Sequence, residues 1–470
     1  MTDKVRMVNE NQCQTCMPLG GVIAFKGVEG AMALVHGSQG CSTYMRLASV
    51  EHYNEPIDIA SSSLNEKQTI HGGEGNLRKA LDNVLRIYQP AVLGVVTTCL
   101  TETIGEDIQR MIKGYVDQRS IVDQRSVVER GLKGVDIIPV NTPSYAGSQS
   151  EGFWAAVRAI VEYFARPAEK HGGINVIVPH ISPADIREIK RILDLAGIEY
   201  TLLPDYSMTL DRPYGGQYTR IAPGGTRTAD IARMAGARAT IQFGLTCPEE
   251  LSPGRYLQQE YGVPLINLPL PIGLENTDRF VETLSQLTGM PLPETLVVER
   301  GWLLDAMADT HKYNAEGRPV IYGEPELVYA FASVCAENGA YPAVVATGTR
   351  SSRLTARLKL LLAEADRQCV LLEETDFTAI ESAAVSTAAN IAVGHSGGKF
   401  LTERRGIPVV RMGFPIHDRI GGQRILSAGY AGTLAFLDRF TNALLEQKYA
   451  SYRQLKREQL LDPISIEGDQ

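Results

Sequence analysis

The chain has 470 residues, of which 44% are hydrophobic and 21% charged, and its formal net charge is −8. This length suggests roughly three domains, and the composition is ordinary for a folded protein. The acidic balance argues against a general nucleic-acid-binding surface. The polar N-terminus and the strand-sized apolar runs predict neither a signal peptide nor a membrane span, so we expect a cytoplasmic protein.

Short β-branched runs alternate with longer helical patterns in three successive stretches of the chain. That rhythm is typical of βαβ units and predicts an α/β protein with mostly parallel sheets. We place the domains at residues 1–160, 161–310 and 311–470, with a helical tail at the end of the third. A long helix or a helix pair is expected over 432–461.

The expected strands are near-continuous apolar runs, as in strands that are buried on both faces. They lie at 92–98, 135–140, 174–178, 201–203, 239–243, 264–268, 319–322, 344–346, 370–372, 391–393 and 409–412. Helical spacing is expected at 76–88, 183–196, 228–234 and 327–338. The letters VDQRS occur at 116–120 and again at 122–126, which indicates a local duplication in a surface segment.

Seven cysteines stand at positions 13, 16, 41, 99, 247, 335 and 369. An odd count without an export signal argues against a disulfide framework. Cys16, Cys41 and Cys99 each stand where an apolar run meets a turn or a helix start. Ligands collect at the carboxyl ends of parallel strands, and backbone N–H groups there favour the thiolate that iron requires. The three positions therefore suit an iron–sulfur site.

A lone cysteine at a strand end is more often a small buried residue, and we adopt that interpretation for Cys247, Cys335 and Cys369. For the three turn-adjacent cysteines both interpretations stay open on these grounds alone. Cys13 and Cys16 form a Cys-x-x-Cys pair, but no second pair accompanies it, so zinc is not expected. Because an iron–sulfur cubane normally takes four protein ligands, three cysteines predict that a second chain supplies the rest.

The chain resembles the nitrogenase component 1 family in segments spread over almost its whole length and in the same order. They are CMPLG at 16–20, LVHGSQGC at 34–41, TCLTETIGED at 98–107, TPSYAGS at 142–148 and RMGFPIHDR at 411–419. Glu106 stands where an aspartate is usual. His71 precedes Gly72 and Gly73, where the nitrogenase β subunit carries an aromatic residue at the surface on which the iron protein docks.

The resemblance implies three Rossmann-like domains, the first of which binds a cluster. It implies a β-type subunit that shares a P-type 8Fe-7S cluster with an α-type (D) subunit in an α2β2 heterotetramer. Cys16, Cys41 and Cys99 match the cluster cysteines, and Ser144 matches a serine that can join them on oxidation. The catalytic iron–sulfur cofactor would belong to the α partner, so no catalytic residue is expected here.

A separate iron protein would dock on the complex, hydrolyse ATP and deliver electrons. In agreement, the sequence contains no G-x-x-x-x-G-K-[ST] loop, and GHSGGK at 394–399 is interpreted as a turn after a strand. His36 is expected to hydrogen-bond the turn beside Cys41, and Glu102 to cap a helix start.

Two departures, His71 and the absence of the long N-terminal extension of the molybdenum type, suggest a divergent member of the family. The favoured function is a subunit of a methylthio-alkane reductase, which cleaves carbon–sulfur bonds of methyl thioethers. The alternatives are a dinitrogen-reducing nitrogenase β subunit, a scaffold subunit for cofactor assembly, and a metal-free Rossmann-type binding protein. The substrate and the heterometal depend on the partner, and the sequence assigns no role to Cys13.

Overall fold

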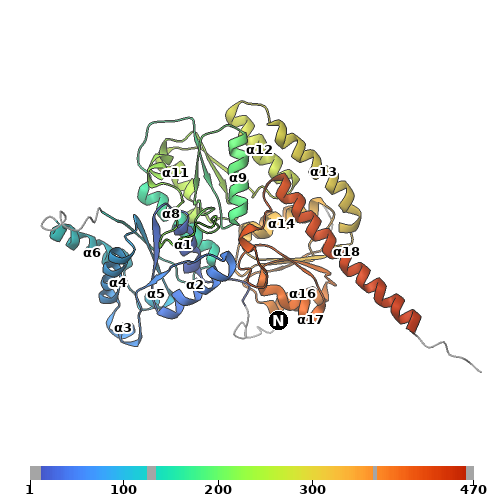
Figure 1. Ribbon diagram of the computed structural model, residues 1–470, viewed down its shortest axis with the longest axis horizontal. Coiled ribbons are helices and arrows are strands. Elements are labelled where there is room, and N and C mark those ends of the chain that lie inside the picture. The colour runs from blue at the N-terminus through green and yellow to red at the C-terminus, as the bar shows by residue number, and fades with distance from the viewer. Residues whose placement is uncertain (1–11, 124–133, 364–367, 462–470) are drawn as a thin grey trace, which may run out of the picture.

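The protein contains three separate parallel β-sheets with helices packed around them, as the computed structural model shows for residues 12–123, 134–363 and 368–461 (Figure 1). The predicted α/β class with parallel sheets is therefore confirmed. The sheets are built from residues 31–140, 174–268 and 319–411. Domain boundaries at 160 and 310 would fall inside helices α8 and α13, and they stay a prediction.

The first sheet has the strand order β2-β1-β3-β4, and all of its neighbouring strands are parallel. Its strands are β1 (Ala31–His36), β2 (Ala60–Ser61), β3 (Val92–Thr97) and β4 (Asp136–Val140). Every residue of β1 and β3 is buried, as expected for strands covered by helices on both faces.

The second and third sheets have the orders β6-β5-β7-β8 and β11-β10-β9-β12-β13, again with parallel neighbours. Their strands are β5 (Ile174–Ile177), β6 (Tyr200–Leu203), β7 (Thr240–Phe243), β8 (Leu265–Leu268), β9 (Pro319–Tyr322), β10 (Val344–Ala346), β11 (Val370–Leu372), β12 (Ile391–Gly394) and β13 (Val409–Arg411). Each strand expected from the sequence agrees with one of these to within about one residue at either end.

The helices connect and cover these strands. They are α1 (Met17–Lys26), α2 (Gln39–Tyr53), α3 (Glu66–His71), α4 (Glu74–Ile87), α5 (Cys99–Thr103), α6 (Ile108–Asp123), α8 (Gln149–Phe164), α9 (Pro183–Leu195), α10 (Thr228–Arg233), α11 (Pro253–Tyr261), α12 (Leu274–Thr288), α13 (Glu294–Asn314), α14 (Pro325–Glu337), α15 (Ser352–Ala363), α16 (Phe377–Ser386), α17 (Lys399–Arg405) and α18 (Gly429–Leu461). No helix in the described ranges is long and apolar enough to cross a bilayer.

The tail is one continuous helix rather than a helix pair. α18 packs along α13, and its last turns extend away from the body of the molecule (Figure 1). The first VDQRS copy lies in α6, and the second runs beyond residue 123, outside the described residues. The GHSGGK segment forms the end of β12 and a 3-10 turn, as interpreted from the sequence.

Helices α1 and α8 pack against each other at backbone distance, and this contact positions the start of both helices. A Cβ atom on Gly20 would collide with the Gln149 carbonyl, and one on Gly152 would collide with the Met17 carbonyl. Glycine at both positions therefore permits the close approach. At the helix starts, Cys16 and Ser148 form an antiparallel β-bridge.

Candidate metal centre

The three turn-adjacent cysteines all stand at helix starts beside the first sheet. Cys16 is the N-cap residue of α1, Cys41 lies in the first turn of α2, and Cys99 is the first residue of α5. β1 leads into α2 and β3 leads into α5, so two of the thiols stand at the carboxyl ends of neighbouring parallel strands. This is the edge at which α/β sheets bind ligands.

Ser144 connects two of these thiols directly. Its backbone N–H donates a hydrogen bond to Cys99 Sγ at 3.2 Å. Its hydroxyl accepts from the Met17 N–H at 3.2 Å and donates to the Cys16 thiol. Cys41 Sγ accepts a hydrogen bond from the Ser38 hydroxyl at 3.5 Å. The four residues predicted from the sequence therefore converge, although they are far apart in the chain.

The pKa of the Cys16 thiol lies above its ordinary value. Burial is the largest cause, and the neighbouring charges of Cys99 and Cys41 raise the pKa further, while the hydrogen bond from Ser144 opposes the shift. The thiols are thus close enough to repel one another electrostatically once they ionise. A bound cationic metal group would reverse this balance, because it stabilises every thiolate that coordinates it.

The other four cysteines lie in different surroundings, although all seven are free thiols. Cys247 and Cys335 are buried, and Cys369 directly precedes β11, where burial raises the pKa of its thiol to about 12. Cys13 is only 2% exposed, and its backbone N–H donates to the Thr375 carbonyl, which anchors it to the third sheet. The Cys-x-x-Cys pair is therefore divided between two environments.

Within the described part of the chain, no three His, Cys, Asp or Glu side chains are arranged to hold a single metal ion. The donor set at this site is three thiols and one hydroxyl, of which Cys99 is exposed. Thiolates of this kind ligate iron–sulfur clusters, in which different irons take different cysteines. The donors therefore suit an iron–sulfur cluster that needs further ligands.

Large apolar side chains are exposed around the thiols. Tyr44, one helical turn after Cys41, is 46% exposed, and Tyr145, next to Ser144, is 66% exposed. Leu47 on α2 is 55% exposed. A group of exposed apolar residues beside these thiols indicates a surface that another protein covers.

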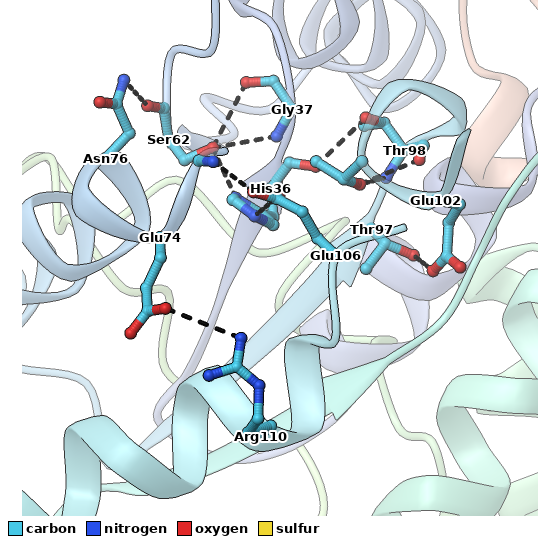
Figure 2. Close-up of polar contacts among 12 residues, drawn as sticks. His36, Gly37, Ser62, Glu74, Asn76, Thr97, Thr98, Glu102, Glu106 and Arg110 are labelled. Atoms are coloured by element: carbon cyan, nitrogen blue, oxygen red, sulfur yellow. Dashed lines mark hydrogen bonds and ion pairs between the residues drawn. The ribbon is translucent and has the colours of Figure 1, made fainter. Parts of the chain in front are cut away.

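His36 lies between the two strand-end loops (Figure 2), and its ring reaches the turn beside Cys41 through the Ser62 hydroxyl rather than by the direct hydrogen bond that was expected. Its ring is fully buried, with Nδ1 2.9 Å from the Ser62 hydroxyl and Nε2 2.6 Å from a Glu106 carboxylate oxygen. Its backbone carbonyl accepts hydrogen bonds from the hydroxyls of Thr98 and Thr101. His36 thus joins the loop before Cys41 to the loop before Cys99.

The expectation that Glu102 caps a helix start is wrong. The cap of α5 is formed by Thr98, whose N–H donates to the Thr101 hydroxyl. Glu102 Oε1 instead accepts hydrogen bonds from the Thr97 hydroxyl and the Asn141 amide, at 2.5 and 2.6 Å. A threonine occupies the capping position, so the glutamate side chain is free to connect the ends of β3 and β4.

Ser148 is a residue of this region that the sequence analysis did not single out. It caps α8, and its hydroxyl contacts Glu151 at 2.7 Å and Glu324 at 3.1 Å. The S-x-x-E spacing of Ser148 and Glu151 is a capping-box signal that could have identified it. The Glu324 contact comes from another sheet and leaves no local signal.

The nitrogenase component 1 type oxidoreductase family model matches residues 16–445. The chain belongs to this family. The match includes all the converging thiols and all three sheets. Membership implies an oxidoreductase with an iron–sulfur centre.

Similar proteins include two nitrogenase molybdenum-iron protein beta chains. That of Methanococcus maripaludis is 36% identical over 95% of this chain and 96% of the relative. That of Clostridium pasteurianum is 34% identical over 93% of both chains. A nitrogenase vanadium-iron protein beta chain from Trichormus variabilis is 35% identical over 92% of this chain and 93% of the relative.

Among solved structures, one titled "Nitrogenase Cp1 at pH 6.5" superposes with a TM-score of 0.88, 33% identity and 95% coverage of both chains. The coverage values also correct one argument from the sequence. Because this chain spans 96% of the Methanococcus maripaludis molybdenum-iron beta chain, a missing N-terminal extension does not separate it from the molybdenum type.

Proposed function

We propose that this chain is the β-type subunit of a nitrogenase-like reductase and holds half of a P-type 8Fe-7S cluster at the interface with an α-type (D) subunit. Cys16, Cys41 and Cys99 would be the iron ligands, and Ser144 would join them on oxidation. The observation that carries the proposal is the convergence of these residues through the hydrogen bonds of Ser144. A metal-free binding protein has no need for this arrangement.

The incomplete ligand set and the exposed apolar surroundings support a second subunit. Three thiols leave an iron–sulfur cluster short of ligands, and Cys99 and Tyr145 are both exposed. An α-type partner in an α2β2 heterotetramer would bury both. When bound, the cluster would accept and release electrons one at a time between an ATP-hydrolysing iron protein and the catalytic cofactor on the partner.

This chain's own groups prepare the site for thiolates. The Ser144 N–H points its hydrogen at Cys99 Sγ, and the Ser38 hydroxyl points its hydrogen at Cys41 Sγ. Donors aimed at sulfur stabilise the anionic form and set the electron density on the ligand. Met17 fixes the Ser144 hydroxyl through its N–H, so the serine is positioned before any metal binds.

For the complex as a whole we propose methyl thioethers as substrate, as in methylthio-alkane reductase. His71 in place of an aromatic residue beside Gly72 supports divergence from dinitrogen-reducing enzymes. Dinitrogen is the second candidate, because the similar proteins are nitrogenase beta chains. The complete set of three cysteines supports a working reductase over an assembly scaffold.

The cluster assignment is tested on the heteromeric complex purified without oxygen. We expect iron in excess of that of the partner's cofactor and the broad visible absorption of iron–sulfur centres. Cys41→Ala should remove the interface cluster and electron flow while the chain stays folded, whereas Cys335→Ala, in the buried helix α14, should leave iron content unchanged. Unchanged iron and turnover in Cys41→Ala would contradict the assignment.

The substrate is tested separately with the intact complex, its iron protein and MgATP. Reduction of a methyl thioether to a thiol and a hydrocarbon is expected to exceed ammonia formation from dinitrogen. Ammonia as the dominant product would select the second candidate and leave the cluster assignment untouched.

A further inference from the structure

One carboxylate, that of Glu106, connects a turn on the protein surface to the loop that carries Cys41. The turn comprises residues 71–73, between α3 and α4, and the loop comprises residues 37–41, between β1 and the first turn of α2. Figure 2 shows Glu106 pointing toward His36, with Ser62 on the other side of the ring. The Glu106 side chain is only 5% exposed.

The surface end of this connection is the N-cap of α4. The backbone N–H of Gly73 donates to Glu106 Oε1, and a Cβ at this position would lie only 2.9 Å from the same oxygen. Gly72 has a φ of +87°, a conformation that favours glycine, and closes α3. His71 and Ile70 are exposed, Ile70 to 78%, so the turn is open to a partner protein.

The inner end of the connection is the His36 ring. A carboxylate only accepts hydrogen bonds, so the hydrogen lies on His36 Nε2 and is donated to Glu106 Oε2 over 2.6 Å. In the neutral ring Nδ1 accepts from the Ser62 hydroxyl, which in turn accepts from the Gly37 N–H at 3.0 Å. An unbroken series of hydrogen bonds thus runs from Gly73 to Gly37.

The charge state of Glu106 agrees with this bridging role. Burial opposes its ionisation, but the hydrogen bonds from His36 and the Gly73 N–H outweigh burial, and the pKa of the carboxyl lies below its ordinary value. The carboxylate uses one oxygen for each donor. Both donors would lose their acceptor at once if the side chain moved away.

We propose that Glu106 is a positioning residue that, through His36, couples the surface turn 71–73 to the cluster loop 37–41. This inference rests on the proposed function, in which an iron protein delivers electrons to the complex, and it takes the exposed turn 71–73 as the place where that protein docks. A protein that shifts the N-cap of α4 shifts the shared carboxylate, and the His36 ring passes the change to the backbone at Gly37. The loop before Cys99 moves with it, because Thr98 donates to the His36 carbonyl.

Glu106→Ala breaks the coupling, because it removes the acceptors of both His36 Nε2–H and the Gly73 N–H. A glutamine would preserve it, since its amide can donate to the other tautomer of His36 while its oxygen still accepts from Gly73. Glu102→Ala is the matched control, because it removes a carboxylate that joins Thr97 to Asn141 instead. Glu106→Asp keeps two acceptor oxygens and should restore part of the lost coupling.

The experiment uses the anaerobic heteromeric complex with its iron protein and MgATP. For Glu106→Ala we expect wild-type iron content and wild-type reduction by dithionite, but about tenfold slower electron transfer from the iron protein, the effect of a lost hydrogen bond. Hydrogen exchange of residues 37–41 should respond to the iron protein in wild type and in Glu102→Ala. It should not respond in Glu106→Ala.

Two results would overturn the coupling. One is a wild-type rate and a wild-type exchange response in Glu106→Ala. The other is a parallel loss of iron and of dithionite reduction, which would make Glu106 merely structural. A wild-type complex without interface iron would instead overturn the proposed function, so the two failures are distinguishable.

Discussion

Cys13 and Cys16 stand in one short motif, yet they belong to different regions of the molecule. Cys16 caps α1 beside Ser144 and within electrostatic reach of Cys41 and Cys99. Cys13 is buried against the third sheet, where burial and the charge of Glu324 raise the pKa of its thiol. The comparison teaches that surroundings, and not residue type or motif, decide which thiols are available to a metal.

The same difference extends to the remaining thiols. Those at helix starts have donors aimed at the sulfur, such as the Ser144 N–H and the Ser38 hydroxyl. Cys335 has no such setting, because it lies inside the buried face of α14. A thiol surrounded by apolar atoms stays protonated and inert. The surface that carries Cys16, Cys41 and Cys99, here called the cluster face, and the buried cysteines should therefore respond differently when a cysteine is replaced.

The largest effect is expected when Cys13 and Cys16 are each replaced separately by alanine. Cys16→Ala should abolish the interface cluster, because it removes one of three thiolates on this chain, whereas Cys13→Ala should keep the iron. Iron analysis and visible absorption of the anaerobic complex measure the difference. Iron loss in Cys13→Ala, or iron retained in Cys16→Ala, would break the comparison.

A smaller effect, on the stability of the fold, is expected when the contact between α1 and α8 that positions Cys16 is disturbed. Gly152→Ala places a methyl group against the Met17 carbonyl and should destabilise the protein by about 3 kcal/mol through overpacking. The control is Gly301→Ala in α13, where no atom lies within 4 Å of the added Cβ. It should be neutral or stabilising by up to about 1 kcal/mol. Thermal unfolding midpoints compare the variants, and equal midpoints would contradict this account of α1 and α8.

Glu324 provides a test of the buried region around Cys13. Burial and the charge of Glu151 raise the pKa of its carboxyl to about 8. In the unfolded chain this carboxyl loses its proton near pH 4.3, so between about pH 5 and 8 the folded state binds more protons. Stability therefore falls as pH rises through that window and levels off above pH 8.

Glu324→Gln removes this proton linkage. The variant should gain about 4 kcal/mol relative to wild type between pH 5 and pH 8, because only wild type has to ionise a buried carboxyl. Unfolding midpoints of both proteins at the two pH values give the difference. A difference that does not change with pH would show that Glu324 is ionised throughout.

The smallest effect is expected far from both regions. Lys448 on α18 forms an exposed ion pair with Glu316 at 2.7 Å. Exposed pairs contribute little, because water and salt screen them. Lys448→Ala should leave iron content and the unfolding midpoint unchanged within error, and a clear decrease in either would mean that the projecting helix supports the cluster face.

The sequence by itself determined β3 to β13, five of the helical segments and the helix-start positions of Cys16, Cys41 and Cys99. These features follow from local periodicity, turn residues and capping, which act over a few residues. The local pattern gave a wrong prediction at Glu102, which was expected to cap a helix start. Thr98 caps α5 instead.

Only the tertiary structure decided where Cys13 lies, how Ser144 connects two thiols, and how Glu106 joins Gly73 to His36. Each of these contacts unites segments that are distant in the chain, so no local pattern encodes it. They depend on how closely the helices approach, and Gly20 and Gly152 permit that approach only because their missing side chains leave room for the opposite backbone.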